Sequence, residues 1–271
     1  MKTVVITGSA RGLGFEMAKL FRKANLNVVT GDLKEENLRI AKEELDKLEG
    51  TGKVEYCVCN VTNSKDIQEL IDFTDKEFNT IDIWINNAGV NQPDKPIWEL
   101  TEQEIDLVLD VDLKGAIIGS KLALEYMSKK KQGAIYNIEG YGSNDAMMKG
   151  LSIYGTSKRA ITYFTQALAK ESEELKTGVI IGRLSPGIMI TDFITNALGD
   201  KGKIELPEKT KKVYNILGDY PDVVANFSVE NMLTNTKNNA HIEWLTNGKA
   251  AWRFMTAGFN KRDFFKTDKK S

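Results

Sequence analysis

The 271-residue sequence has few of the residues that build several common kinds of site. Its only cysteines are Cys57 and Cys59, and its only histidine is His241. A closed zinc site needs a full set of cysteine or histidine ligands, so no metal site is expected. Cys57 and Cys59 alternate along an expected strand and share a face, where cysteines rarely bridge, which predicts two reduced core residues. A catalytic triad based on histidine has no support in the sequence.

The sequence also lacks a dominant charge and a long apolar run. With 37 Lys and Arg against 38 Asp and Glu, the formal net charge is −1, so there is no basic field suited to nucleic acid. No apolar run approaches the roughly 18 residues of a membrane-spanning helix. The first expected strand begins at once, with no signal peptide before it. These features predict a soluble, cytoplasmic protein without nucleic-acid or membrane partners.

What the sequence does contain is a glycine-rich turn between a β-branched strand and a helix. The turn follows the run Lys2 to Thr7 and reads Thr-Gly-Ser-Ala-Arg-Gly-Leu-Gly from Thr7 to Gly14. Free backbone N–H groups and the helix dipole at such a turn suit a pyrophosphate, and glycine lets the backbone approach it closely. The turn therefore predicts a dinucleotide site. The candidate contacts are Gly8, Ser9, Arg11, Gly12, Leu13 and Gly14.

A carboxylate follows the second expected strand. Asp32 comes 18 residues after Gly14, about where a carboxylate would accept hydrogen bonds from the adenosine ribose. A carboxylate there would repel a 2′-phosphate, which favours NAD(H) over NADP(H). Arg11 could attract that phosphate, so NADP(H) remains possible. In the alternative interpretation, Asp32 only begins the following loop.

Strand and helix patterns alternate along the whole chain. Strands are expected near residues 3–7, 26–30, 53–59, 81–86, 133–138, 178–183 and 241–246. Helices are expected near residues 12–24, 34–48, 64–78, 101–129, 152–175, 208–217 and 221–234. The predicted fold class is α/β, a Rossmann-type doubly wound parallel sheet of about seven strands with helices on both faces, in a single domain.

Tyr154 and Lys158 form a candidate acid–base pair. Their spacing of four places both side chains on one face of a helix. An ammonium group favours the phenolate, so Lys158 is expected to lower the Tyr154 pKa and help Tyr154 exchange a proton with a substrate oxygen. By itself the spacing more often marks a solvated helix face. The other motifs of the chain favour the acid–base interpretation instead.

Together these motifs resemble the short-chain dehydrogenase/reductase family, over roughly residues 2–192. The family's Asn-Asn-Ala-Gly stands at Asn86 to Gly89, its catalytic pair matches Tyr154 and Lys158, and its nicotinamide-side loop matches residues 185–191. The stretch from Tyr136 to Ser143 also resembles the chlorophyll b reductase-like branch. Neither resemblance names a substrate.

The resemblance implies roles for individual residues. Tyr154 would be the general acid/base, and Lys158 would hold the nicotinamide ribose. Residues 1–135 would mainly bind the dinucleotide, and residues 136–271 would hold the catalytic and substrate half, with a lid near 187–220. The further cofactor contacts would be Asn60, Val61, Asn87, Ala88, Gly89, Tyr154, Lys158, Pro186, Gly187, Ile188 and Thr191.

Two positions depart from the family pattern. The position of the family's catalytic serine is Gly140, and Ser143 is the nearest hydroxyl on that loop, so Ser143 is the candidate donor to the substrate oxygen. The alternative is that Ser143 only caps a turn. Asp112 stands where the family has asparagine, and an ionised Asp112 would draw on the Lys158 charge that lowers the Tyr154 pKa.

The sequence therefore predicts an NAD(P)(H)-dependent oxidoreductase that interconverts a secondary alcohol and a carbonyl. Its catalytic residues would be Ser143, Tyr154, Lys158 and Asp112, its partner a small-molecule carbonyl or alcohol, and its assembly a homodimer or homotetramer by family resemblance. One alternative is a dinucleotide-binding sensor or scaffold without turnover. Another is an epimerase or dehydratase acting on a nucleotide sugar, which usually has a longer C-terminal part.

Overall fold

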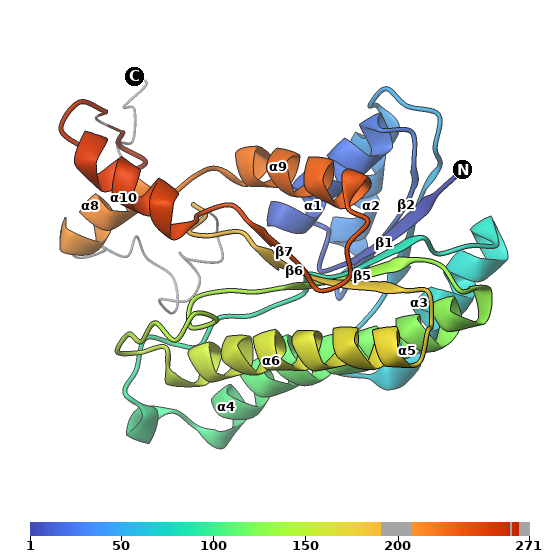
Figure 1. Ribbon diagram of the computed structural model, residues 1–271, viewed down its shortest axis with the longest axis horizontal. Helices are drawn as coiled ribbons and strands as arrows, with labels where there is room; N and C mark the ends of the chain where they lie inside the picture. The colour runs from blue at the N-terminus through green and yellow to red at the C-terminus, as the bar shows by residue number, and fades with distance from the viewer. Residues whose placement is uncertain (191–207, 261, 266–271) are drawn as a thin grey trace.

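The computed structural model describes residues 1–190, 208–260 and 262–265, and in those ranges seven parallel strands form one sheet (Figure 1). The strand order is β3-β2-β1-β4-β5-β6-β7. This order confirms the predicted doubly wound sheet, and each strand lies within a few residues of its expected position. The strands are β1 (Thr3–Thr7), β2 (Asn27–Asp32), β3 (Val54–Val58), β4 (Ile83–Asn86), β5 (Ala134–Ile138), β6 (Ile180–Ser185) and β7 (Ala240–Glu243).

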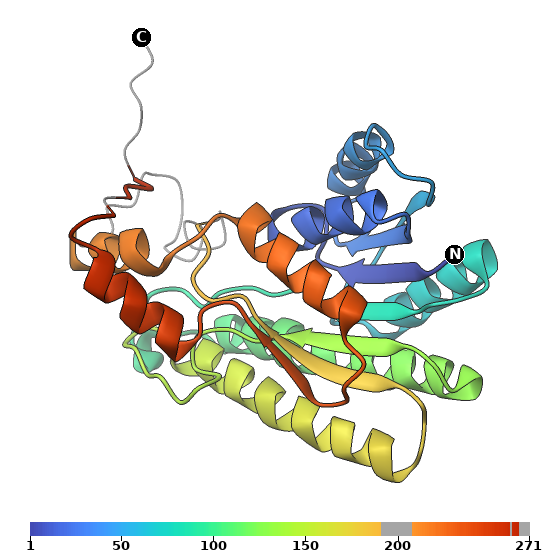
Figure 2. The same ribbon diagram turned by 45° about the horizontal axis from the view of Figure 1, so that its top comes forward.

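Helices cover both faces of the sheet (Figures 1 and 2). One face carries α1, α2 and α9, and the other carries α3, α5 and α6. The helices are α1 (Gly12–Lys23), α2 (Glu35–Asp46), α3 (Ser64–Phe78), α4 (Glu102–Val108), α5 (Ala116–Lys130), α6 (Ser152–Glu174), α8 (Glu208–Leu217), α9 (Pro221–Thr234) and α10 (Asn247–Thr256).

The alternation of side chains along each strand divides the core into two layers. In β1, Val4 and Ile6 pack under α1 and α9, whereas Val5 packs on the opposite face. Val28 and Val29 of β2 divide in the same way. Successive side chains of a strand point to opposite faces of the sheet. A strand that is buried on both faces therefore reads as a continuous β-branched run.

The structure differs from the predicted helices in two places. The helix expected over 101–129 begins with a capping box at Thr101 and Glu104, but a π-helical segment, Leu109–Gly115, separates α4 from α5. The wider turn carries Asp112 inward, where its side chain is buried. Helix α10 was not expected. Part of the lid predicted near 187–220 lies outside the described residues.

In the ranges that the structure describes, no helix combines the length and the apolar character needed to cross a bilayer.

Candidate active site

The carboxyl ends of the central strands bring most of the predicted site residues to one edge of the sheet. Thr7 pairs with Gly31 at the ends of β1 and β2, and Asn86 pairs with Asn137 at the ends of β4 and β5. The N-terminus of α6 and the loops after β4 and β5 lie at the same end of the molecule (Figure 1). This is the edge at which open parallel sheets bind ligands.

The glycine-rich turn is braced by the Asn-Asn-Ala-Gly motif. Asn87 donates from Nδ2 to the carbonyl oxygens of Thr7 at 3.0 Å and Gly8 at 2.8 Å. A β-carbon built on Gly14 would lie 2.5 Å from Asn87 Nδ2, and one on Gly8 would lie 2.6 Å from Ala88 Cα. A side chain at Gly8 or Gly14 would clash with the Asn-Asn-Ala-Gly motif, so the close contact between the two motifs requires glycine at both positions.

Gly12 differs from these two glycines, because it faces open space. Its φ of +61° favours glycine, and a β-carbon built on it would meet no heavy atom within 4 Å. The start of α1 thus offers backbone N–H groups to an uncrowded position. This cradle fits the pyrophosphate of a dinucleotide.

Asp32 lies against the same turn. Its Oδ2 accepts a hydrogen bond from the Ala10 N–H at 3.1 Å, and its Oδ1 accepts one from the Leu33 N–H at 2.7 Å. The carboxylate is therefore fixed where β2 ends beside the glycine-rich turn. Asn60 Oδ1 accepts from the backbone N–H of Thr62 at 3.1 Å and from its hydroxyl at 2.9 Å, so this oxygen serves a local turn. Adenine contact by Asn60 and cofactor contact by the neighbouring Val61 stay predictions.

Tyr154 and Lys158 lie on one buried face of α6. The Tyr154 side chain is 8% exposed, and Lys158 Nζ lies 5.4 Å from the centre of its ring. Lys158 Nζ also lies 3.0 Å from Asp112 Oδ2, and both side chains of this ion pair are buried. Asp112 Oδ1 accepts the Val90 N–H at 2.7 Å. The lysine is thus shared between the phenol and a buried carboxylate.

The contact between Lys158 and Asp112 affects the pKa of the Tyr154 phenol. Burial raises the pKa of Tyr154 to about 12, Lys158 opposes that rise, and the Asp112 charge adds to it. The sequence predicted that Lys158 would lower the Tyr154 pKa, and in this structure the balance runs the other way. Burial disfavours the charged lysine, yet Asp112 and Tyr154 raise the Lys158 pKa above its usual value. Burial raises the Asp112 pKa despite the opposing charge of Lys158.

The loop after β5 places Ser143 in a turn. Its hydroxyl accepts the Gly140 N–H at 3.1 Å and donates to the Lys158 carbonyl oxygen at 3.3 Å. This geometry matches the alternative of a turn-capping serine. A catalytic role for Ser143 stays a prediction.

Gly140 leaves room for the phenol. A β-carbon built on Gly140 would overlap Tyr154 Oη and would lie 3.1 Å from Lys158 Cγ. The usual serine of the family therefore does not fit here while Tyr154 keeps this position. The glycine at position 140 and the position of the Tyr154 phenol therefore depend on each other.

Gly140→Ala is expected to destabilise the protein by about 1–3 kcal/mol and to lower kcat, because the new methyl group displaces the phenol. Gly155→Ala is the matched control, since a β-carbon built there would meet only ordinary contacts at 3.9 Å. Thermal unfolding and steady-state turnover measure both effects. Equal stability and turnover in the two variants would contradict this account of Gly140.

Glu139 lies in a buried polar cluster that the sequence motifs do not indicate. This carboxylate accepts hydrogen bonds from Thr162 Oγ1 at 2.8 Å and from Ser185 Oγ, and it contacts His241 Nε2 at 3.0 Å. Burial would raise its pKa, but these hydrogen bonds outweigh burial and lower the pKa to about 2. Ser185 contacts the same nitrogen, Nε2 of His241, so the three groups form no proton relay. The partners come from separate elements, and no local pattern marks them.

The nicotinamide-side loop is held by the C-terminal part of the chain. A β-carbon built on Gly187, whose φ is +72°, would lie 2.7 Å from Leu245 Cβ. The Asp219 N–H donates to the Ile188 carbonyl oxygen at 3.0 Å, and the Asp219 side chain accepts hydrogen bonds from Trp244 Nε1, Arg253 Nη1 and Arg262 Nη1. Contact of Pro186, Gly187 and Ile188 with a cofactor stays a prediction, and Thr191 lies outside the described residues.

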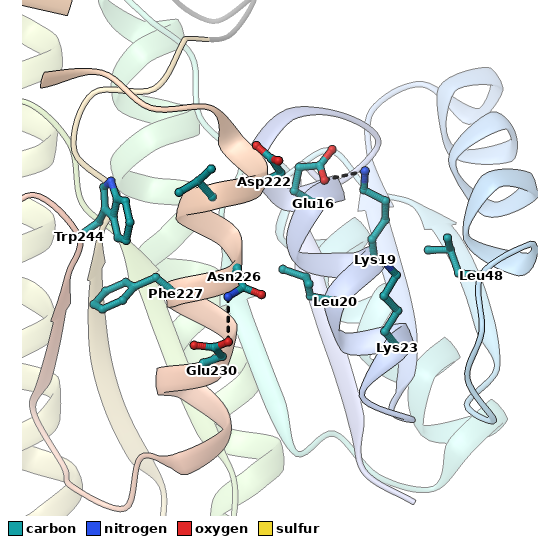
Figure 3. Close-up of a pocket in the computed structure, with 11 residues that line it drawn as sticks. Glu16, Lys19, Leu20, Lys23, Leu48, Asp222, Asn226, Phe227, Glu230 and Trp244 are labelled. Carbon is teal, nitrogen blue, oxygen red and sulfur yellow. Dashed lines mark hydrogen bonds and ion pairs between the residues drawn. The ribbon is translucent and has the colours of Figure 1, made fainter. Parts of the chain in front are cut away.

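A surface pocket of 740 Å³ lies away from Tyr154 and Lys158 (Figure 3). It lies between α1 and α9, and Leu20, Phe227 and Trp244 are among the side chains that line it. It contains neither the acid–base pair nor the glycine-rich turn, so we do not place the chemistry there.

Comparison with known proteins identifies the family. Residues 2–201 match the family model described as short chain dehydrogenase. The chain is 33% identical over 260 residues to the chloroplastic chlorophyll(ide) b reductase NOL of Oryza sativa subsp. japonica, covering 93% of this chain and 74% of that protein. It is 28% identical over 280 residues to the probable chloroplastic chlorophyll(ide) b reductase NYC1 of Arabidopsis thaliana, covering 97% of this chain. It spans only 54% of that relative.

Among solved structures, levodione reductase superposes with a TM-score of 0.80 at 22% identity, covering 92% of this chain and 98% of the other, which supports the fold. The sequence relatives also correct one expectation. The chlorophyll(ide) b reductases of both plants are chloroplastic proteins, which contradicts the prediction of a cytoplasmic protein. That prediction depended on where the first strand begins, and the position of a strand does not determine a compartment.

The motifs, their convergence at one edge of the sheet and the matched family model agree, and the resemblance extends to the chlorophyll b reductase-like branch. The chain is a member of the short-chain dehydrogenase/reductase family, an oxidoreductase that acts on alcohol or carbonyl groups with NAD or NADP.

Proposed function

We propose that the protein reduces a carbonyl group with NADH, and that Tyr154 protonates the carbonyl oxygen. The observation that carries this proposal is the burial of Tyr154 and Lys158 on one face of α6, beside Gly140 and at the same sheet edge as the glycine-rich turn. Asp32 and the open cradle at Gly12 support the dinucleotide. The bound nicotinamide would supply the hydride.

The electrostatics of the phenol support reduction as the working direction. A phenol of ordinary pKa, about 10, is protonated at neutral pH, and burial, which raises the Tyr154 pKa to about 12, favours this form further. A protonated phenol is the form that can donate to a carbonyl oxygen. Lys158 would then stabilise the phenolate that remains, and the buried Asp112 would keep Lys158 charged and in place.

Two loops beside Tyr154 support a large apolar substrate. Trp98, in the loop after β4, is 81% exposed, and Met147, in the loop after β5, is 91% exposed. The two loops touch, because a β-carbon built on Gly150 would overlap the Asp94 carboxylate. Large apolar side chains exposed on two touching loops are the kind of surface that binds an apolar ligand. We therefore propose chlorophyllide b, suggested by the relatives' names, as the first substrate to test.

The test is consumption of NADH and of NADPH with chlorophyllide b, levodione and simple ketones as acceptors. The proposal predicts oxidation of NADH with at least one acceptor and formation of the matching alcohol. A protein that binds NADH but reduces none of these acceptors would instead support the alternative of a dinucleotide sensor. The engaged hydroxyl of Ser143 is the observation that favours that alternative. The homodimer or homotetramer stays a prediction, which light scattering would test.

Asp32→Asn is expected to raise the ratio of kcat/KM for NADPH to that for NADH by at least about tenfold, because the charge that repels a 2′-phosphate is lost. Asparagine keeps an oxygen for the Ala10 N–H, so the turn should persist. Glu35→Gln, an exposed change in the first turn of α2, is the control. An unchanged ratio in Asp32→Asn would show that Asp32 does not select the cofactor.

A further inference from the structure

Gln92 lies in the loop after β4 and is 1% exposed. Its Oε1 accepts hydrogen bonds from the Ile153 N–H at 2.7 Å and the Tyr154 N–H at 3.0 Å. These N–H groups belong to the first turn of α6, and the N-cap residue, Leu151, has an apolar side chain that cannot accept them. Two backbone donors therefore fix the orientation of the amide, with its oxygen toward the helix.

The same amide carries a donor that the fold does not use. Gln92 Nε2 is buried and has no hydrogen-bond partner among the residues that the structure describes. A buried polar group without a partner costs about 1–3 kcal/mol. Capping α6 needs only an acceptor, so the cap explains the amide oxygen but not the amide nitrogen. The unused N–H groups of Gln92 therefore need an explanation other than the cap of α6.

The chemistry of the site calls for such a donor. The family's serine position is Gly140, and the Ser143 hydroxyl donates to the Lys158 carbonyl oxygen. A carbonyl under reduction develops negative charge on its oxygen, and a fixed neutral donor stabilises that charge. Gln92 is bound through its Oε1 to the backbone N–H of the residue that supplies the proton, which holds its amide beside that residue.

We propose that Gln92 is a catalytic residue whose Nε2–H donates a hydrogen bond to the substrate oxygen that Tyr154 protonates. The proposal rests on the proposed reductase function. Gln92 transfers no proton: it orients the carbonyl and stabilises the developing oxyanion, while the proton comes from Tyr154. The substrate must therefore present an oxygen with room for two donors, as an aldehyde or ketone does.

The test compares two variants of the full chain. Gln92→Glu keeps an acceptor for α6 but loses the donor, and Gln92→Met is uncharged, similar in shape and has no N–H. Both are expected to lower kcat by about 100-fold with the accepted carbonyl substrate, while the Kd for NADH stays within about twofold. Gln92→Glu keeps the cap of α6 but buries a charge, so it is expected to unfold below the wild-type temperature, and thermal unfolding separates this loss of stability from the loss of kcat.

Gln166→Glu, an exposed change on the same helix, is the matched control for added charge. The charge of Gln92→Glu also raises the Tyr154 pKa, so its pH profile shifts, whereas Gln92→Met should lose kcat at every pH. If both variants keep kcat within about threefold of wild type, Gln92 only caps α6 and the proposal is wrong. That outcome differs from failure of the proposed function, in which the wild type itself reduces no carbonyl.

Discussion

Replacing Tyr154 by phenylalanine is expected to lower kcat for carbonyl reduction by about 10²–10⁴-fold, because no other described group donates the proton with the same geometry. The ring that packs beside Gly140 is retained, so the fold and the Kd for NADH should change little. Steady-state kinetics and NADH titration by fluorescence measure the two quantities.

Tyr163→Phe is the matched control. Tyr163 lies on the same helix but is exposed, and the loss of its hydroxyl should leave kcat unchanged. If Tyr154→Phe turned over as fast as Tyr163→Phe, the acid–base assignment would be refuted. If it lost NADH binding as well, the phenol would be a binding group and not the proton donor.

Replacing Asp112 by asparagine is expected to move the pH dependence of turnover to lower pH. Burial raises the Tyr154 pKa, Lys158 lowers it and the Asp112 charge raises it, so removal of that charge lowers it. Reduction needs the protonated phenol and falls as pH rises through its pKa, so in the variant the fall should begin at lower pH. Alcohol oxidation needs the phenolate, so its rise should also begin at lower pH.

Asp110→Asn is the control for this experiment. Asp110 Oδ1 lies 3.2 Å from Lys114 Nζ on the exposed side of the same π-helical segment. The loss of its charge should therefore leave the pH profile unchanged. Asparagine at 112 keeps an oxygen for the Val90 N–H, so the backbone of the site should persist. Profiles that coincide for wild type and Asp112→Asn would show that Asp112 does not act on the phenol.

The order of strands and helices could be predicted from the sequence because it depends on local patterns. Buried parallel strands read as β-branched runs, as in β1 and β2, and amphipathic helices read as apolar residues at helical spacing, as in α1. The break at Leu109–Gly115 could not be predicted, because a π-helical turn leaves the sequence pattern almost unchanged.

The candidate site was only partly predictable for a related reason. The glycine-rich turn and the Tyr–Lys spacing are short motifs whose geometry is local. The pKa of Tyr154 depends on its burial and on Asp112, which lies 42 positions earlier in the sequence. Gln92 and Glu139 act through contacts across several elements, and a lone glutamine or glutamate in a loop gives no local signal.

The most direct test of the account is a crystal structure of the protein with NADH bound. We expect the adenosine ribose on Asp32, the pyrophosphate over Gly12, and the nicotinamide beside the Tyr154 phenol with Lys158 on its ribose. A dinucleotide bound elsewhere, or a Tyr154 phenol directed away from the nicotinamide, would contradict it.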